Sequence, residues 1–327
     1  MIKMSQNELL LAYKSRKEKL RVWGEYLKEN IEKCVKAEFE NTIAFINGPR
    51  IKEEGSFIEK ALFRKSSYSN PLFEITDQVG IRFIVSLLSD VNKIKKLILN
   101  SDMWISQCDR DFFQEMDARP NYFDYQSVHI ICWPKSKICI NNLEIDETFK
   151  CEIQIRSILQ HAYAEISHQL IYKKPIAKLG NGLHRKMHRS IALMEVVDEY
   201  FVETNDCIKS ETKFYDKIVI ESISLCKKEN IAYITIPKLN SRIINFIETI
   251  VSEQCCCVYD LSLISKDSCL VAKNIMSRND SFLYQQPSLI VIIDLISKFP
   301  NIICHQWPFN KSYLETIYSF MGISVNN

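Results

Sequence analysis

The sequence predicts an α/β (α+β) fold that is followed by a C-terminal, mostly helical region. Three observations support this: helical spacing of apolar residues near the N-terminus, a β-branched run at 79–85, and strict apolar–polar alternation at 149–156. The chain has 327 residues, of which 46% are hydrophobic, so it can bury a substantial core. This length suits one large domain, expected at 1–210, and a smaller accessory region at 211–327.

The first hundred residues predict three helices and a strand. Leu20, Trp23, Leu27 and Ile31 recur every three or four positions, which predicts an amphipathic helix over 7–40. A second helix is expected over 56–65, with Ser56 as its N-cap and a capping-box glutamate three residues later. The run 79–85 then predicts a strand, and 91–99 returns to helical spacing.

Two further strands and two helices complete the expected large domain. Strands are predicted at 125–133 and 148–155. In the second strand the even positions are polar, so one face is core and the other is polar. Helices follow over 157–172 and about 183–208. Beyond 210, short apolar segments predict mostly helical structure.

Composition excludes several classes of function. Only seven glycines occur, and none forms GxxxxGK or GxGxxG, so a phosphate site must use Lys and Arg side chains. The net charge of +2 offers no global polycation, so nucleic acid would need a local patch. Twelve cysteines, with no leader peptide and no apolar run of membrane length, predict a cytoplasmic protein with reduced thiols and no membrane partner.

Two segments suggest phosphate and metal chemistry. Ser56, Lys60 and Arg64 share one face at helical spacing and could converge on a polyphosphate, although a solvated basic helix has the same pattern. Asp77 precedes the strand that contains Arg82. An aspartate at the mouth of a strand can ligate Mg²⁺, and the arginine can stack on a base; a simple surface ion pair is the alternative.

A third segment places an acid, an amide and a guanidinium on one strand face, at Glu152, Gln154 and Arg156. They could orient a nucleophile, or they could be the solvent-facing side of an edge strand. The next helix presents His161 and Glu165, with a second histidine at 168. Without further ligands, hydrogen bonding is favoured there over a transition-metal site.

Taken in order, these segments resemble the RelA/SpoT synthetase domain over about residues 45–205. The matching motifs are Lys52-x3-Ser56-x3-Lys60, Asp77-x2-Gly80-Ile81-Arg82, Tyr125-Gln126-Ser127-Val128-His129, Glu152-Ile153-Gln154-Ile155-Arg156 and His161-Ala162-Tyr163-Ala164-Glu165. The resemblance implies a nucleotidyltransferase-like mixed sheet flanked by helices. It also implies a pyrophosphokinase that transfers the β,γ-pyrophosphate of ATP to the 3′-hydroxyl of GDP or GTP, giving the alarmone (p)ppGpp.

The same resemblance implies roles for individual residues. Asp77 and Glu152 would be catalytic and would share Mg²⁺, with Glu152 activating the 3′-hydroxyl. The residues implied to bind ATP are Arg50, Lys52, Ser56, Lys60 and Arg82. Those implied to bind the acceptor are Tyr125, His129, Gln154 and His161. No histidine precedes His129, so the His-Asp hydrolase domain of bifunctional relatives is expected to be absent.

The acceptor side leaves alternatives open. Asp124 stands where relatives usually have glycine, and His161 where many have asparagine. The leading acceptor is GDP or GTP; the alternative is a toxic relative that modifies the 3′ end of tRNA or makes adenosine alarmones. A catalytically silent nucleotide-sensing module is a third possibility, against which the paired carboxylates argue. Region 211–327 could bind a protein inhibitor, an antitoxin or another copy of the chain.

Overall fold

The computed structural model describes residues 5–39, 42–64, 68–121, 123, 127–172, 181–254 and 260–323. Their contacts divide the chain into two compact units, Met1–Asn205 and Asp206–Asn327. The sequence places this boundary at 210, near the end of the helix that crosses it.

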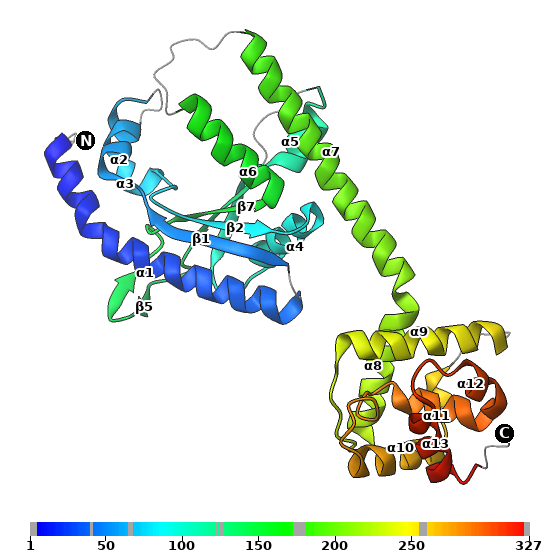
Figure 1. The fold of residues 1–327 in the computed structure, drawn as a ribbon. Coiled ribbons are helices and arrows are strands. Elements are labelled where there is room, and N and C mark those ends of the chain that lie inside the picture. Colours follow the sequence, from blue (N-terminus) through cyan, green and yellow to red (C-terminus); the bar gives the residue numbers. More distant parts are fainter. Residues whose placement is uncertain are drawn as a thin grey trace. The chain divides into compact units, whose positions relative to one another are not determined.

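The first unit contains a five-stranded sheet and the helices that flank it (Figure 1). Its elements are α1 (Gln6–Glu38), β1 (Ile43–Ile51), α2 (Glu54–Leu62), α3 (Pro71–Glu74), β2 (Val79–Val85), α4 (Leu88–Leu99), β3 (Ile105–Asp111), α5 (Phe112–Ala118), β4 (Val128–Trp133), β5 (Ile138–Ile140), β6 (Leu143–Ile145), β7 (Cys151–Ser157), α6 (Ile158–Ser167), a π-helical turn (His168–Tyr172) and α7 (Asn181–Glu211), which continues into the second unit.

The sheet is mixed, with strand order β1-β2-β7-β4-β3. β2 and β7 run parallel, whereas β1–β2, β4–β7 and β3–β4 are antiparallel. The last strand among the described residues, β7, therefore joins two antiparallel pairs at the centre of the sheet. This confirms the predicted α/β fold with a mixed sheet flanked by helices.

One face of the sheet is the core, which α1 and α4 cover, while α6 lies on the other side (Figure 1). Phe83 and Ile153 point into this core together with Trp23 and Leu27 of α1, and all four are fully buried. Burying an apolar side chain of this size contributes roughly 1.5–3 kcal/mol. The indole N–H of Trp23 also donates to the carbonyl oxygen of Cys132, 3.3 Å away, which ties α1 to β4.

The predicted start of the second helix is wrong. α2 begins at Glu54, its N-cap is Glu53, and no side chain caps it, so Ser56 lies inside the helix. The backbone N–H of Phe57 donates to the carbonyl oxygen of Glu53, which closes a helical turn before the expected one. The motif Ser-x-x-Glu matched a capping box by sequence, but the helix had already begun.

Strand β1 was not among the expected elements, and it positions part of the site. It pairs with β2, and its register shifts between Asn47 and Arg50. Gly48 lies at this irregularity with φ +107°, and a Cβ there would come within 2.7 Å of the Gly80 carbonyl oxygen. Only glycine allows this close approach of the two backbones.

Asp198 fastens α7 to the end of β7. Its carboxylate accepts a 2.5 Å hydrogen bond from the hydroxyl of Ser157, which is the N-cap of α6. Asp198 is only 3% exposed. Burial raises the pKa of Asp198 above its ordinary value, and the hydrogen bond from Ser157 offsets only part of this.

We expect Asp198→Asn to raise the midpoint of thermal unfolding at neutral pH. Because the folded state binds the Asp198 proton more tightly than the unfolded state, wild-type stability falls as pH rises through the window between the two pKa values. Asparagine does not ionise, so it avoids this loss of stability, and its side-chain oxygen can still accept the hydrogen bond from the Ser157 hydroxyl. Melting curves from acid to neutral pH test this: the difference should disappear near the ordinary aspartate pKa of about 3.9. A difference that is constant with pH would contradict the explanation.

The second unit is all-helical among its described residues. Its helices are α8 (Lys213–Lys228), α9 (Pro237–Gln254), α10 (Lys266–Arg278), α11 (Leu289–Lys298), α12 (Pro300–Gln306) and α13 (Lys311–Met321), with a 3₁₀ turn at Leu261–Leu263. It has its own core, in which Ile244, Ile247 and Ile293 are fully buried. In the described part of the chain, no helix is long and apolar enough to cross a membrane.

Candidate active site

A row of polar side chains crosses the sheet on the face opposite the core. The register places Arg82 of β2 beside Gln154 of β7, and Gln154 beside His129 of β4. Glu152 lies two residues before Gln154 and is paired with Gly80, which leaves space above it. Because side chains alternate along a strand, all four polar groups share one face.

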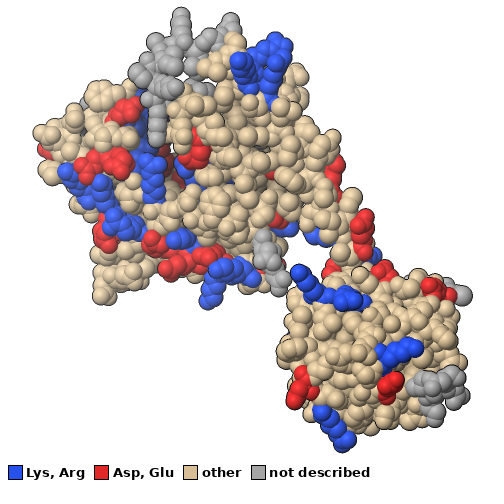
Figure 2. Space-filling model, in the orientation of Figure 1, with Lys and Arg blue, Asp and Glu red and all other residues tan. Residues whose placement is uncertain are grey.

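This face forms one wall of a pocket of about 550 Å³. Figure 2 shows that Lys and Arg side chains are interleaved with acidic ones over this unit. The pocket is lined by Asn47, Gly48, Arg50, Lys52, Glu53, Ser56, Asp77, Gly80, Ile81, Arg82, Glu152, Gln154, His161 and Glu165. Eight residues named from the sequence are therefore brought together. Of the others, Lys60 and His129 contact pocket residues, and Tyr125 lies outside the described residues.

Asp77 is held between two lysines. Its Oδ2 accepts from Lys52 Nζ at 2.7 Å, and Lys60 Nζ lies 3.0 Å from Oδ1. Burial acts to raise the pKa of Asp77, but the hydrogen bond and charge of Lys52, together with Lys60, outweigh it, so this pKa lies below its ordinary value. Asp77 is therefore ionised at neutral pH, with cations arranged for an anionic ligand.

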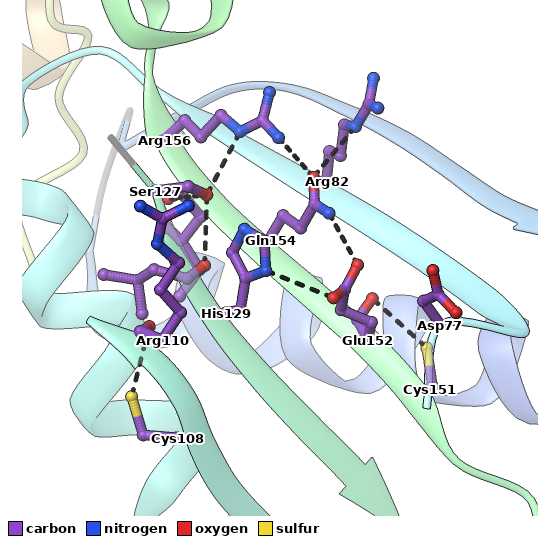
Figure 3. Close-up of polar contacts among 12 residues, drawn as sticks. Asp77, Arg82, Cys108, Arg110, Ser127, His129, Cys151, Glu152, Gln154 and Arg156 are labelled. Carbon is purple, nitrogen blue, oxygen red and sulfur yellow. Dashed lines mark hydrogen bonds and ion pairs between the residues drawn. The ribbon is translucent and has the colours of Figure 1, made fainter. Parts of the chain in front are cut away.

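Glu152 is held from two sides, by Gln154 of its own strand and by His129 of the neighbouring strand β4 (Figure 3). Gln154 Nε2 donates to Oε2 at 2.7 Å, and His129 Nδ1 lies 3.3 Å from Oε1. Burial acts to raise the pKa of Glu152, but the hydrogen bond and charge of His129, together with the hydrogen bond from Gln154, outweigh it, so this pKa lies below its ordinary value. Glu152 is thus a fixed carboxylate, and Figure 3 shows Asp77 beside it.

Gln154 connects Glu152 to two arginines. Its Oε1 accepts from Arg82 Nε at 3.2 Å and from Arg156 Nη2 at 2.5 Å. Arg156 is 2% exposed, and its Nε donates to the Ser127 hydroxyl at 3.2 Å. With its oxygen so engaged, the amide of Gln154 must direct its N–H toward Glu152.

The far end of Arg82 is paired with α6. Its Nη1 lies 2.9 Å from Glu165 Oε1. His161, one turn earlier on α6, packs edge-on against Phe45, and its buried Nδ1 has no hydrogen-bond partner. Burial and the nearby Arg156 lower the pKa of His161, which favours a neutral ring at pH 7. His161 was predicted for the acceptor side but lies among residues near Arg82, which was predicted for the donor.

The carboxylates suit a metal that arrives with its substrate. Asp77 Oδ1 is buried and accepts no hydrogen bond, although Lys60 is close. Among the residues that the structure describes, no group of three or more His, Cys, Asp or Glu could hold an ion alone. Mg²⁺ is typically bound by one or two carboxylates together with substrate phosphates and waters, so the donor set fits that ion.

Several pocket residues were not predicted as site residues. Asn47 and Gly48 come from β1, and Glu53 immediately precedes α2. Glu165 had been noted only as part of a histidine-containing helix face. The signal for Glu165 was available, because it lies four residues after His161 and therefore on the same helical face.

Fold and site together define a class: an α/β domain with one carboxylate on its sheet and another just before β2, in a pocket whose lysine and arginine side chains suit a polyphosphate. Comparison with known families then gives a closer assignment. Residues 49–177 match the region found in RelA / SpoT proteins, so the chain contains a RelA/SpoT-type domain. The resemblance read from the motifs is confirmed, and the matched segment contains most of the pocket.

Two curated relatives come from Bacillus subtilis (strain 168). GTP pyrophosphokinase YwaC is 27% identical over 165 residues, which is 50% of this chain and 72% of that protein. GTP pyrophosphokinase YjbM is 26% identical over 132 residues, which is 40% of this chain and 57% of that protein. Among solved structures, the small alarmone synthetase 1 from Bacillus subtilis aligns with a TM-score of 0.47 at 22% identity, covering 62% of this chain and 96% of that one.

Proposed function

We propose that this chain is a Mg²⁺-dependent pyrophosphokinase that transfers the β,γ-pyrophosphate of ATP to the 3′-hydroxyl of GDP or GTP. The observation that carries the proposal is the pair Asp77, just before β2, and Glu152, on the adjacent parallel strand β7, in a RelA/SpoT-type domain and in a pocket whose lining includes Arg50, Lys52 and Arg82. The similarity to two GTP pyrophosphokinases supports this reaction and this acceptor.

In the proposed reaction, the acceptor 3′-oxygen attacks the β-phosphorus of ATP. The bond between that phosphorus and the α–β bridging oxygen breaks, AMP leaves, and the hydroxyl proton passes to a base or to water. Lys52 and Lys60, which now pair with Asp77, would instead bind the phosphates of ATP. Bound Mg²⁺ would neutralise phosphate oxygens and polarise the transferred group.

The two arginines Arg50 and Arg82 would hold the donor base, and Ser56 would contact the phosphates. Glu165 would keep the Arg82 guanidinium in a fixed plane, since one edge of Arg82 is paired with Glu165 and the other with Gln154. The donor would then lie on the β1–β2 side of the sheet. His129 and Gln154 would support the acceptor on the β4 side.

Glu152 is better suited to orient the acceptor hydroxyl than to act as a strong base. A general base works best when its pKa is near the working pH, whereas the pKa of Glu152 is lowered. A low-pKa carboxylate held by His129 and Gln154 can accept the hydroxyl hydrogen bond and share the metal. Positioning and charge stabilisation would supply most of the catalysis.

An RNA 3′ end is the second candidate acceptor, and one observation favours it. The start of α7 exposes Arg185, Lys186 and Arg189, and Figure 2 shows Lys and Arg side chains gathered there. His188 Nδ1 lies 2.5 Å from the carbonyl oxygen of Phe123, two residues before Tyr125 in the sequence. This basic segment is thus joined to the segment that leads to the expected acceptor residue, where it could bind phosphates.

An acceptor screen tests the proposal. ATP labelled at the γ-phosphate is incubated with Mg²⁺ and the full chain, separately with GDP, GTP, adenine nucleotides and tRNA. We expect AMP and a labelled guanine nucleotide, and no product with EDTA. If only tRNA became labelled, the acceptor would be an RNA 3′ end and not GDP or GTP. The absence of label on every acceptor would overturn the enzymatic proposal.

A further inference from the structure

The N-terminal half of α1 contacts the short connection that carries Lys52. This residue lies between the end of β1 and the start of α2, and α1 passes beside α2 (Figure 1). The phenol of Tyr13, on α1, donates a hydrogen bond of 2.7 Å to the backbone carbonyl oxygen of Lys52. Tyr13 precedes residues 49–177, which match the RelA/SpoT region. A helix outside the matched segment therefore bonds directly to a residue that lines the pocket.

The surroundings of Tyr13 fix the position of its hydroxyl. Its ring is fully buried and is stacked on the ring of Phe57, with the two centroids 3.9 Å apart and the planes 5° apart. Phe57 is itself fully buried and follows Ser56 in α2. Burial and the nearby charge of Asp77 raise the pKa of Tyr13. The phenol is therefore protonated at neutral pH and remains a hydrogen-bond donor.

The backbone of Lys52 is held on both sides. Its carbonyl oxygen accepts from Tyr13, and its N–H donates to the carbonyl oxygen of Gln78 at 2.9 Å. Gln78 follows Asp77 and is 1% exposed, and its side-chain amide donates to two carbonyl oxygens earlier in the chain. Because both backbone groups of Lys52 are engaged, its Cα has a fixed place, from which the side chain reaches Asp77 Oδ2.

Packing alone does not account for the phenol of Tyr13. A phenylalanine would fill the same space and keep the stack, so the hydroxyl adds only the bond to Lys52. The other polar links between α1 and α2 are the ion pairs of Lys14 and Lys17 with Glu54, at 3.3 and 2.7 Å. These three side chains are partly exposed, and exposed ion pairs contribute little. The hydrogen bond from a fully buried ring is thus the more specific link.

We propose that Tyr13 is a positioning residue for ATP: its hydroxyl fixes the Lys52 backbone so that the Lys52 ammonium group meets the ATP phosphates. This inference rests on the proposed function, in which Lys52 binds those phosphates. Tyr13 acts only through Lys52 and does not itself line the pocket. Without the hydroxyl, the Lys52 carbonyl oxygen loses its partner and the peptide can rotate. The ammonium group then has to be ordered when ATP binds, which weakens binding.

Isothermal titration calorimetry of the full chain with a non-hydrolysable ATP analogue and Mg²⁺ tests the proposal. Tyr13→Phe keeps the ring and its stack with Phe57 but removes the donor. We expect its dissociation constant to be about five- to tenfold higher than that of the wild type. Tyr26→Phe is the matched control, because it removes a phenol hydroxyl from a partly buried ring of the same helix, stacked on Trp23 and outside the pocket lining. It should bind the analogue like the wild type, and thermal melts show that both variants are folded.

A double-mutant cycle separates positioning from a general weakening of the pocket. In a Lys52→Met background there is no ammonium group to position, so adding Tyr13→Phe should change the dissociation constant less than about twofold. Equal binding by wild type and Tyr13→Phe would overturn the role of Tyr13, and so would a full effect in the Lys52→Met background; both outcomes leave the proposed reaction standing. A wild type that does not bind the analogue would instead overturn the proposed ATP site, and the role of Tyr13 with it.

Discussion

Replacing Glu152 by glutamine is expected to lower pyrophosphoryl transfer roughly 10³-fold while the fold is retained. Glutamine has the same shape and can still accept from Gln154 through its oxygen, and its N–H₂ can face His129. What is lost is the negative charge that would hold the acceptor hydroxyl and share the metal. The measurement is the initial rate of AMP release with saturating ATP and acceptor.

The matched control is Glu144→Gln. Glu144 lies on β6, where its exposed carboxylate pairs with Lys137 at 2.6 Å, outside the pocket lining. It should keep wild-type activity and show that an isosteric loss of one surface charge is harmless. If Glu152→Gln retained more than about a tenth of the wild-type rate, Glu152 would not be the orienting carboxylate.

The loss of Asp77 is expected to be comparably large. Asp77→Asn removes the oxygen charge that would bind Mg²⁺, and it leaves Lys52 and Lys60 without their shared anion. We expect a decrease of about three orders of magnitude in rate, or roughly 4 kcal/mol of transition-state stabilisation. The Mg²⁺ concentration that gives half-maximal rate should also rise, which a simple packing defect would not produce.

Asp102→Asn provides the comparison for this variant. Asp102 is a fully exposed carboxylate with a long 3.4 Å contact to Lys135, so its Mg²⁺ dependence and rate should match the wild type. Thermal melts separate stability from catalysis, because the two lysines of Asp77→Asn repel each other in the folded state. An unchanged Mg²⁺ dependence in a folded Asp77→Asn protein would remove Asp77 from the metal site.

The strands with regular patterns could be predicted from the sequence, and the irregular ones could not. β2 and β7 have alternating or β-branched runs, and both were found. β1 was missed because Asn47, Gly48 and Pro49 interrupt its apolar pattern, although pairing with β2 stabilises it. β3 was missed because Ile105–Asp111 is mostly polar and lies at the edge of the sheet.

The small β5–β6 hairpin had a signal that was not used. Asn141 and Asn142 both have positive φ, which asparagine tolerates better than most residues, and they lie between two short apolar segments. Such a pair is typical of a two-residue hairpin turn. Local turn chemistry could therefore have identified this element before the structure did.

Motif order located the pocket but could not show its internal contacts. Asp77, Glu152 and Gln154 were expected together and are together. The ion pair of Arg82 with Glu165 depends on how α6 lies over the sheet, which no spacing specifies. The position of His161 beside Phe45 likewise requires β1, an element that was missed.

The central place of β7 has a consequence for how the protein is made. The pairs β1–β2 and β3–β4 can each form from earlier parts of the chain, but only β7 joins them. Gly80 of β2 pairs with Glu152 of β7, which lies 72 residues later in the sequence. Contacts so distant in sequence form late and slowly. A chain still emerging from the ribosome therefore carries Asp77 without Glu152, and the pocket is completed only when nearly the whole first unit has been synthesised.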